Sequence, residues 1–334
     1  MPKGYIPLAD ARATQADALA RALASLAEDI RSLQARHFLQ GPGPIFLGIG
    51  ASFAASAAAV WTLRSRGIHS WRLNAGEHPI PFPETLHPMI GVSQSGKSAE
   101  TLAALETIDP RLRFSVVNAE KSPIESIAAA HLPLGNIPDS YASTIGYTAT
   151  VAALGMLAEA WDGGTIDSTW PSLSDVFRTT ERAIGSRIGT LIAPLRDAQY
   201  VDCVAAAASS GSAEVGALLL REIARIPSTG MSTRQYLHGA MESAGRGAHI
   251  IFGEEREVQL AQKLARAGYD VILASPLDID EENHLVHVAI PSLSPAQRPI
   301  VEALIMQTIA VEAAIARELD PDAFVFQNND TKVA

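Results

Sequence analysis

Residues 88–101 read PMIGVSQSGKSAET and decide the fold, because a short apolar run passes through a serine-rich turn into a helical pattern. A buried strand that leads directly into a helix is the unit from which parallel α/β sheets are built. The same order recurs upstream, where residues 45–53 (IFLGIGASF) lead into an alanine-rich helical stretch. We therefore expect parallel strands whose two faces are covered by helices.

Eight apolar runs are predicted strands, and they form two groups separated by the turn-forming residues 162–174. The runs are 45–49, 88–92, 114–118 and 128–134, followed by 199–206, 248–252, 271–274 and 285–290. The two halves also share an order of strand, serine-containing turn and alanine-rich helix, which indicates a duplication. The predicted fold class is α/β, with two doubly wound parallel-sheet (flavodoxin-like) subdomains in tandem. The predicted divisions are a helical segment at 1–34, subdomains at 35–165 and 175–318, and a tail at 319–334 that closes the site.

The composition favours a water-soluble protein and excludes some classes of partner. The 36 acidic residues outnumber the 26 basic ones, and a net charge of −10 does not suit a nucleic-acid backbone. Apolar windows such as 151–160 and 201–208 fall short of the roughly 20 residues that cross a bilayer. Cys203 is the single cysteine, which fits a reducing compartment. We expect a cytoplasmic protein with no nucleic-acid and no membrane partner.

The serine-rich turn has the ingredients of a phosphate site. Backbone N–H groups at the start of a helix point outward unpaired, and the helix dipole adds partial positive charge there. The hydroxyls of Ser93, Ser95 and Ser98 add donors, Gly96 allows close approach, and Ser52 stands at the matching strand–helix junction one strand away. These groups suit a phosphate monoester. The alternative is that the serines only cap helices.

Nucleotide and metal motifs are not matched. GIGASF lacks the third glycine of a dinucleotide fingerprint, and SQSGKS lacks the spacing of a Walker A loop. None of the nine histidines is paired at the H-x-x-x-H spacing of a helical metal site. We expect neither a cofactor nor a bound metal.

With these residues in hand, the chain resembles the double SIS-domain (sugar isomerase) family. The most specific motif is SQSGKSAET, supported by GIGAS, NAGEHP, YASTIGYT and REIARIPSTGMSTRQYLHG. The family includes the isomerase half of glucosamine-6-phosphate synthase, free-standing deaminases of amino-sugar phosphates and deglycases of fructosyl-amine phosphates. The resemblance covers the chain from about residue 16 to its end.

The resemblance implies a role for each matched residue. Glu222 is the implied base that moves a proton between C1 and C2 of the sugar. His238 is the implied ring-opening residue, acting in the neighbouring subunit of a homodimer, and Lys332 is the implied lysine that closes the site. The implied ligand is a small sugar phosphate, and the residues implied to bind its phosphate and hydroxyl groups are Ser52, Ser93, Gln94, Ser95, Ser98 and Ser143.

The chemistry of this assignment stands on its own. Moving a proton between adjacent carbons needs a carboxylate, and ring opening needs a group that exchanges protons near pH 7, which suits histidine. Glu222 lies on an apolar helical stretch, so burial is expected to raise its pKa. The alternative is an ordinary helical glutamate that pairs with Arg221 or Arg225.

Three departures from the family pattern leave the substrate open. Leu219, Ile145 and Ala240 stand where relatives have lysine, lysine and proline. Because the first predicted strand begins already at residue 45, we also expect no glutaminase domain. The predicted activity is aldose–ketose proton transfer on an amino-sugar phosphate, similar to glucosamine-6-phosphate deaminase. The alternatives are a deglycase of fructosyl-amine phosphates, a non-catalytic sugar-phosphate-binding regulator, and an enzyme for an unphosphorylated or acidic sugar.

Overall fold

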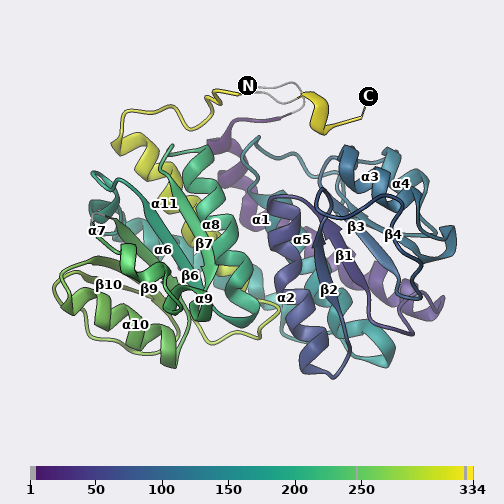
Figure 1. Cartoon of the computed structure of the whole chain (residues 1–334), viewed down its shortest axis with the longest axis horizontal. Coiled ribbons are helices and arrows are strands. Elements are labelled where there is room, and N and C mark those ends of the chain that lie inside the picture. The colour runs from purple at the N-terminus through teal and green to yellow at the C-terminus, as the bar shows by residue number, and fades with distance from the viewer. Residues whose placement is uncertain (1–4, 246, 327–328, 334) are drawn as a thin grey trace. The chain divides into compact units, whose positions relative to one another are not determined.

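The computed structural model describes residues 5–245, 247–326 and 329–333. The chain divides into two compact units, whose elements are labelled in Figure 1. One, here called the N-terminal unit, contains the residues up to Ser174 together with the tail from Val325. The other, the C-terminal unit, is Asp175–Phe324.

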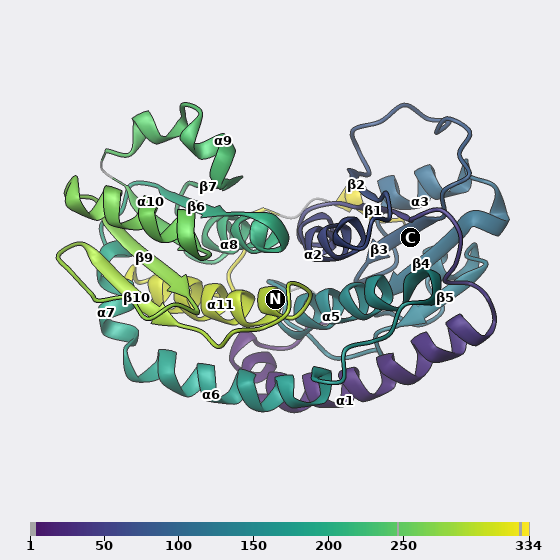
Figure 2. The ribbon, with the colours of Figure 1, turned by 90° about the horizontal axis from the view of Figure 1, so that it is seen from below.

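The N-terminal unit is built on a five-stranded parallel sheet with the order β2-β1-β3-β4-β5. Its strands are β1 (Ile45–Gly48), β2 (Trp71–Asn74), β3 (Met89–Ser93), β4 (Arg113–Val117) and β5 (Ala130–Pro133). Its helices are α1 (Leu8–Ala35), α2 (Ala51–Ser65), α3 (Ala99–Glu106), α4 (Pro123–Ser126) and α5 (Ile145–Ala160). Helix α5 packs against both α1 and α2, as Figure 2 shows, while α3 and α4 pack against β3 and β4.

The C-terminal unit has its own five-stranded parallel sheet, with the order β10-β9-β8-β6-β7. Its strands are β6 (Val201–Ala205), β7 (Ser228–Ser232), β8 (Ala248–Phe252), β9 (Asp270–Ser275) and β10 (Leu285–Ala289). The helices are α6 (Leu173–Ser186), which begins just before the unit, α7 (Ile188–Ile192), α8 (Ser210–Glu222), α9 (Thr233–Leu237), α10 (Glu255–Arg266) and α11 (Arg298–Ala316).

The two sheets have the same topology. Numbered along the chain, each runs 2-1-3-4-5, the order typical of flavodoxin-like sheets. The central strands are buried along their whole length, as expected for parallel strands with helices on both faces, and this explains their continuous apolar runs. The prediction of two doubly wound α/β subdomains in tandem is therefore confirmed.

Two strands were missing from the sequence prediction. Strand β2 (WRLN) and strand β7 (STGMS) each pair with only one neighbour, at an edge of their sheet. Both contain half-buried or exposed residues, and Trp71 is 40% exposed. Because edge strands need not be apolar, they give little hydrophobic signal in the sequence.

Helix α11 is a longer apolar segment than the windows 151–160 and 201–208 considered above. By length and composition the helix is able to span one, because it has 19 residues and a mean hydropathy of 1.6 in its most apolar window. However, 83% of that window is buried inside the protein. The helix packs against α8 and α7 of its own unit, which is how a core helix of an α/β sheet is arranged.

Candidate active site

The topology of the N-terminal unit brings the two serine-containing turns to neighbouring strand ends. Strands β1 and β3 are paired, with Leu47 opposite Gly91, and the strand order reverses between them. In open α/β sheets, ligands bind at such a reversal, outside the carboxyl ends of the strands. Ser52 follows β1, and residues 93–98, here called the serine loop, follow β3.

Glycine gives the serine loop its conformation. Gly96 has φ +61°, and a Cβ at this position would lie 2.1 Å from Ser122 Oγ. The loop is also fixed by its backbone, because the Gln94 carbonyl accepts hydrogen bonds from the N–H groups of Asn118 and Ala119 at 3.1 and 3.0 Å. A loop held in this way presents its polar groups with little conformational freedom.

The serine hydroxyls do not cap the adjacent helices. Ser98 is the N-cap residue of α3 but makes no side-chain cap, and α2 begins after Gly50 without one. Ser93 Oγ accepts from the N–H of Gly96 at 3.1 Å, a bond within the loop. For the Ser52 hydroxyl we find no hydrogen bond among the residues described. The capping alternative therefore does not account for these serines.

Asp139 joins the serine loop to the turn before α5, and the sequence analysis did not identify it. This buried carboxylate accepts from the side-chain amide of Gln94 at 3.0 Å and from the Ser143 hydroxyl at 2.8 Å. Four further donors surround it: the N–H groups of Ser140, Thr144 and Gly146, and the Thr144 hydroxyl. A negative charge at the start of α5 is also favoured by the helix dipole.

The tail brings Lys332 to the serine loop. Lys332 forms an isolated antiparallel bridge with Ser98, and the N–H of Val333 donates to the Lys97 carbonyl at 3.0 Å. The Lys332 ammonium group donates to the Tyr5 hydroxyl at 3.1 Å. Of the predicted site residues in this unit, Lys332 thus contacts the loop directly, and Gln94 and Ser143 meet through Asp139.

The C-terminal unit holds Glu222 in an unusual environment. Glu222 is the last residue of α8 and is partly buried, but neither neighbouring arginine pairs with it. Arg221 donates to the Ser228 carbonyl at 2.6 Å, and Arg225 donates to the Ala323 carbonyl at 2.9 Å. Burial alone raises the pKa of the Glu222 carboxyl to about 7. The alternative of an ordinary ion-paired glutamate is therefore excluded by these contacts.

His238 lies in the same unit, immediately after α9. Its backbone N–H donates to the Gln235 carbonyl at 3.1 Å, and its side chain is exposed. Among the residues described, the imidazole has no hydrogen bond or ion pair. The imidazole is therefore accessible to a ligand.

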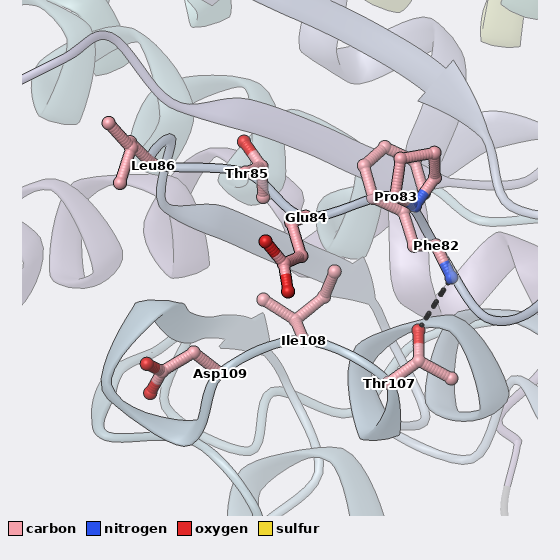
Figure 3. Close-up of a pocket in the computed structure, with 8 residues that line it drawn as sticks. All are labelled: Phe82, Pro83, Glu84, Thr85, Leu86, Thr107, Ile108 and Asp109. Carbon is pink, nitrogen blue, oxygen red and sulfur yellow. Dashed lines mark hydrogen bonds between the residues drawn. The ribbon is translucent and has the colours of Figure 1, made fainter.

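A pocket of about 540 Å³ in the N-terminal unit lies elsewhere. Figure 3 shows that it is lined by residues 82–86 and 107–109, with the Phe82 N–H donating to the Thr107 hydroxyl at 3.0 Å. These segments precede β3 and β4, so they lie toward the amino ends of these strands, opposite the serine loop. None of the predicted site residues lines this pocket. In the described part of the chain, no three His, Cys, Asp or Glu residues are grouped to hold a metal ion.

Curated relatives resemble part of the chain. Glutamine–fructose-6-phosphate aminotransferase (isomerizing) of Zymomonas mobilis is 27% identical over 255 residues, which are 69% of this chain and 42% of the relative. The Pyrococcus horikoshii enzyme of that name is 23% identical over 298 residues, 83% of this chain and 50% of the relative. The chain thus spans half or less of the length of these relatives. No protein-family model matches it.

Solved structures share the whole fold. The C-terminal domain of glucosamine-fructose-6-phosphate aminotransferase from Francisella tularensis superposes with a TM-score of 0.80 at 16% identity, over 96% of this chain and 98% of that one. Tagatose-6-phosphate ketose/aldose isomerase from Escherichia coli gives 0.76 at 18% identity, over 92% of each chain. Glucosamine-6-phosphate deaminase from Thermotoga maritima gives 0.68 at 14% identity, over 93% and 98%. Taken with the sequence relatives and the two tandem sheets, these matches show that the chain has the tandem α/β fold of double SIS-domain proteins, and they support its resemblance to that family.

Proposed function

We propose that the protein transfers a proton between C1 and C2 of an amino-sugar phosphate, in the manner of a glucosamine-6-phosphate deaminase. The observation that carries this proposal is the state of Glu222. Its carboxyl group is partly buried, has no cationic partner among the described residues, and has a pKa raised to about 7. A general base is most effective when its pKa is close to the working pH.

The proposed reaction uses Glu222 in one proton transfer. The ionised carboxylate takes the proton from C2 of the open-chain aldose and returns it to C1, while one proton passes from the C2 amine to O1, which leaves a hydroxyl at C1 and an imine at C2. Water adds at C2 and ammonia leaves, so that glucosamine-6-phosphate and water give fructose-6-phosphate and ammonia. Ring opening is assigned to His238, because an imidazole gives and takes protons near neutral pH.

The phosphate group is assigned to the turns at the reversal of strand order. Hydroxyls of Ser52, Ser93, Ser95 and Ser98 supply uncharged donors, and the start of α3 supplies partial positive charge. The amide of Gln94 and the hydroxyl of Ser143 both donate to the carboxylate of Asp139, which orients them, and Ser143 is assigned to the sugar hydroxyls. Lys332, whose backbone forms a bridge with Ser98, adds an ammonium group from the tail.

The proposal includes a homodimer and a cytoplasmic location. The exposed side chain of His238 has no partner among the described residues of its own chain, which supports a role in the site of a second copy. The expectation follows the family resemblance, in which this histidine acts across the dimer.

The experiment is proton NMR of the purified protein in D₂O, first with glucosamine-6-phosphate and then with fructose-6-phosphate and ammonium. Conversion between the two sugars, with loss of the C1 or C2 proton signal, is the expected result. The Glu222→Gln variant is expected to bind ligand but to lose conversion. Glu255→Gln, which removes an exposed carboxylate from α10 of the same unit, is the matched control.

Each other outcome has a defined meaning. Proton exchange without conversion points to a working base and a different amine substituent, as in a deglycase of fructosyl-amine phosphates. Binding without any exchange contradicts catalysis and favours the sugar-phosphate-binding regulator. Full turnover by Glu222→Gln overturns the assigned mechanism.

A further inference from the structure

The amine of Lys332 is held by an aromatic side chain from the other end of the chain. Its Nζ donates to the Tyr5 hydroxyl at 3.1 Å and lies 5.6 Å from the centre of the Tyr5 ring. The hydroxyl accepts this hydrogen bond from a charged donor, which makes the contact stronger than one between neutral groups. Lys332 is exposed, so without Tyr5 its long side chain would sample many conformations.

Tyr5 is itself fixed to the candidate site. Its ring packs edge-on against Tyr141, with 5.1 Å between the ring centres. The next residue, Ile6, donates its N–H to the carbonyl of Asp139 at 3.1 Å. Asp139 is the residue whose carboxylate orients Gln94 and Ser143. Tyr5 and its neighbour Ile6 therefore each contact the turn that precedes α5.

The backbone of Lys332 is placed separately from its amine. The bridge to Ser98 and the hydrogen bond from Val333 to Lys97 fix the main chain of the tail against the serine loop. These contacts do not determine the side-chain rotamer. The hydroxyl of Tyr5 is thus the contact that selects one direction for the amine.

We propose that Tyr5 is a positioning residue, which holds the Lys332 amine in one orientation beside the serine loop. This inference deepens the proposed function and rests on it, since Lys332 is taken to contact the sugar phosphate. Tyr5 itself need not touch the substrate. Its effect on turnover is transmitted through the direction of the lysine amine.

The first test measures Lys332 without requiring any enzymatic activity. Wild type and Tyr5→Phe are acetylated with an N-hydroxysuccinimide ester, and acetylation at Lys332 and at the exposed Lys121 is followed by mass spectrometry. Tyr5→Phe keeps the ring and its packing on Tyr141 but loses the hydroxyl. We expect Lys332 to react about two- to tenfold faster in the variant, the range that one net hydrogen bond supports. Lys121 should react at an unchanged rate.

The second test asks whether Tyr5 acts through Lys332. Turnover of glucosamine-6-phosphate is measured for Tyr5→Phe, Lys332→Met and the double variant. If Tyr5 only positions the amine, the double variant is no slower than Lys332→Met, because nothing is left to position. If Tyr5 instead has only a structural role, Tyr5→Phe will slow turnover by the same factor in the wild type and in Lys332→Met.

Failure of the inference and failure of the proposed function give different results. Equal acetylation of Lys332 in wild type and Tyr5→Phe overturns the inference, whatever the enzyme does. An undiminished effect of Tyr5→Phe in the Lys332→Met background also overturns it. Absence of turnover in the wild type contradicts the proposed function alone, and the acetylation rates still decide the role of Tyr5.

Discussion

The carboxylate of Asp139 accepts a hydrogen bond from the side-chain amide of Gln94 at 3.0 Å, and this bond joins two turns that are 45 residues apart in the sequence. Gly146 makes the approach possible, because a Cβ at this position would lie 2.2 Å from Gln94 Nε2 and 2.5 Å from Asp139 Oδ2. The serine loop and the start of α5 are therefore organised around one buried charge.

Asp139→Asn tests this organisation. An asparagine at this position turns an N–H₂ group toward donors that the carboxylate accepted, so hydrogen bonds are lost and donors face each other. We expect the free energy of unfolding to fall by about 1 to 3 kcal/mol, and sugar-phosphate binding to weaken. Urea denaturation measures the first effect and titration calorimetry the second.

A double-mutant cycle that combines Asp139→Asn with Gln94→Ala measures the coupling free energy between these two side chains. If Asp139 orients Gln94, the effects of the two substitutions on ligand binding are not additive, with a coupling of about 0.5 to 3 kcal/mol. Asp10→Asn, at an exposed residue in the first turn of α1, is the control and should leave binding unchanged. Simple additivity of Asp139→Asn and Gln94→Ala would show that the hydrogen bond has no role in the site.

Gly96→Ala tests the conformation of the serine loop against a matched glycine. Gly96 and Gly67 both have positive φ, +61° and +78°, but a Cβ at Gly67 meets no atom within 4 Å. Gly67→Ala should cost about 1 to 2 kcal/mol of stability, from the left-handed backbone alone. Gly96→Ala should cost about 1 to 3 kcal/mol more, because the new methyl group collides with Ser122, and only this variant should lose phosphate binding. Thermal unfolding and phosphate titration check both effects; equal losses in the two variants would contradict the account.

Ser98→Ala tests whether the serine loop binds phosphate. A hydrogen bond from a hydroxyl to a charged phosphate contributes about 1.5 to 3 kcal/mol to the binding free energy. The affinity of Ser98→Ala for glucosamine-6-phosphate should therefore fall by about tenfold or more. Binding of unphosphorylated glucosamine should not change. Ser126→Ala removes an exposed hydroxyl from the end of α4 and serves as the control. If both sugars lose affinity equally, or neither does, the loop does not recognise phosphate.

The raised pKa of Glu222 predicts how stability depends on pH. The ordinary pKa of the carboxyl is 4.5, and in the folded protein it is about 7, so the folded state binds this proton more tightly than the unfolded state. Ionisation of Glu222 therefore lowers the free energy of unfolding as pH rises from 4.5 to 7. The full decrease is present above pH 7. Glu222→Gln should be more stable than wild type by about 1 to 3 kcal/mol at pH 8 and nearly equal to it at pH 4. Urea denaturation at the two pH values measures this difference, and the opposite sign would show that the carboxylate has a favourable partner.

Much of the fold could be predicted from the sequence, because its signal is local. A central strand such as β3 is buried on both faces and reads as an unbroken apolar run, and the glycine and serines that follow it mark the turn. Strands β2 and β7 could not be predicted in this way, since an edge strand is completed by pairing with β1 or β6 rather than by its own residues.

The site was less predictable because its contacts are distant in sequence. Asp139 is an ordinary turn residue in the sequence, and its role depends on Gln94, which only the sheet brings near. Lys332 was identified by resemblance, but its link to Tyr5 spans 327 residues and has no local signature. The pKa of Glu222 was expected to rise from the apolar helix around it. What the sequence could not supply was that Arg221 and Arg225 are bonded to backbone carbonyls instead.

The most direct test of the central claim is the pH dependence of proton exchange at C1 and C2 in D₂O, compared between wild type and Glu222→Gln. We expect exchange in the wild type to rise with pH and to level off above a midpoint near 7, the pKa of Glu222, and to be lost in the variant. Exchange that is independent of pH between 5.5 and 8.5 (about three units around the predicted midpoint), or that survives in Glu222→Gln, would contradict the assignment of Glu222 as the base.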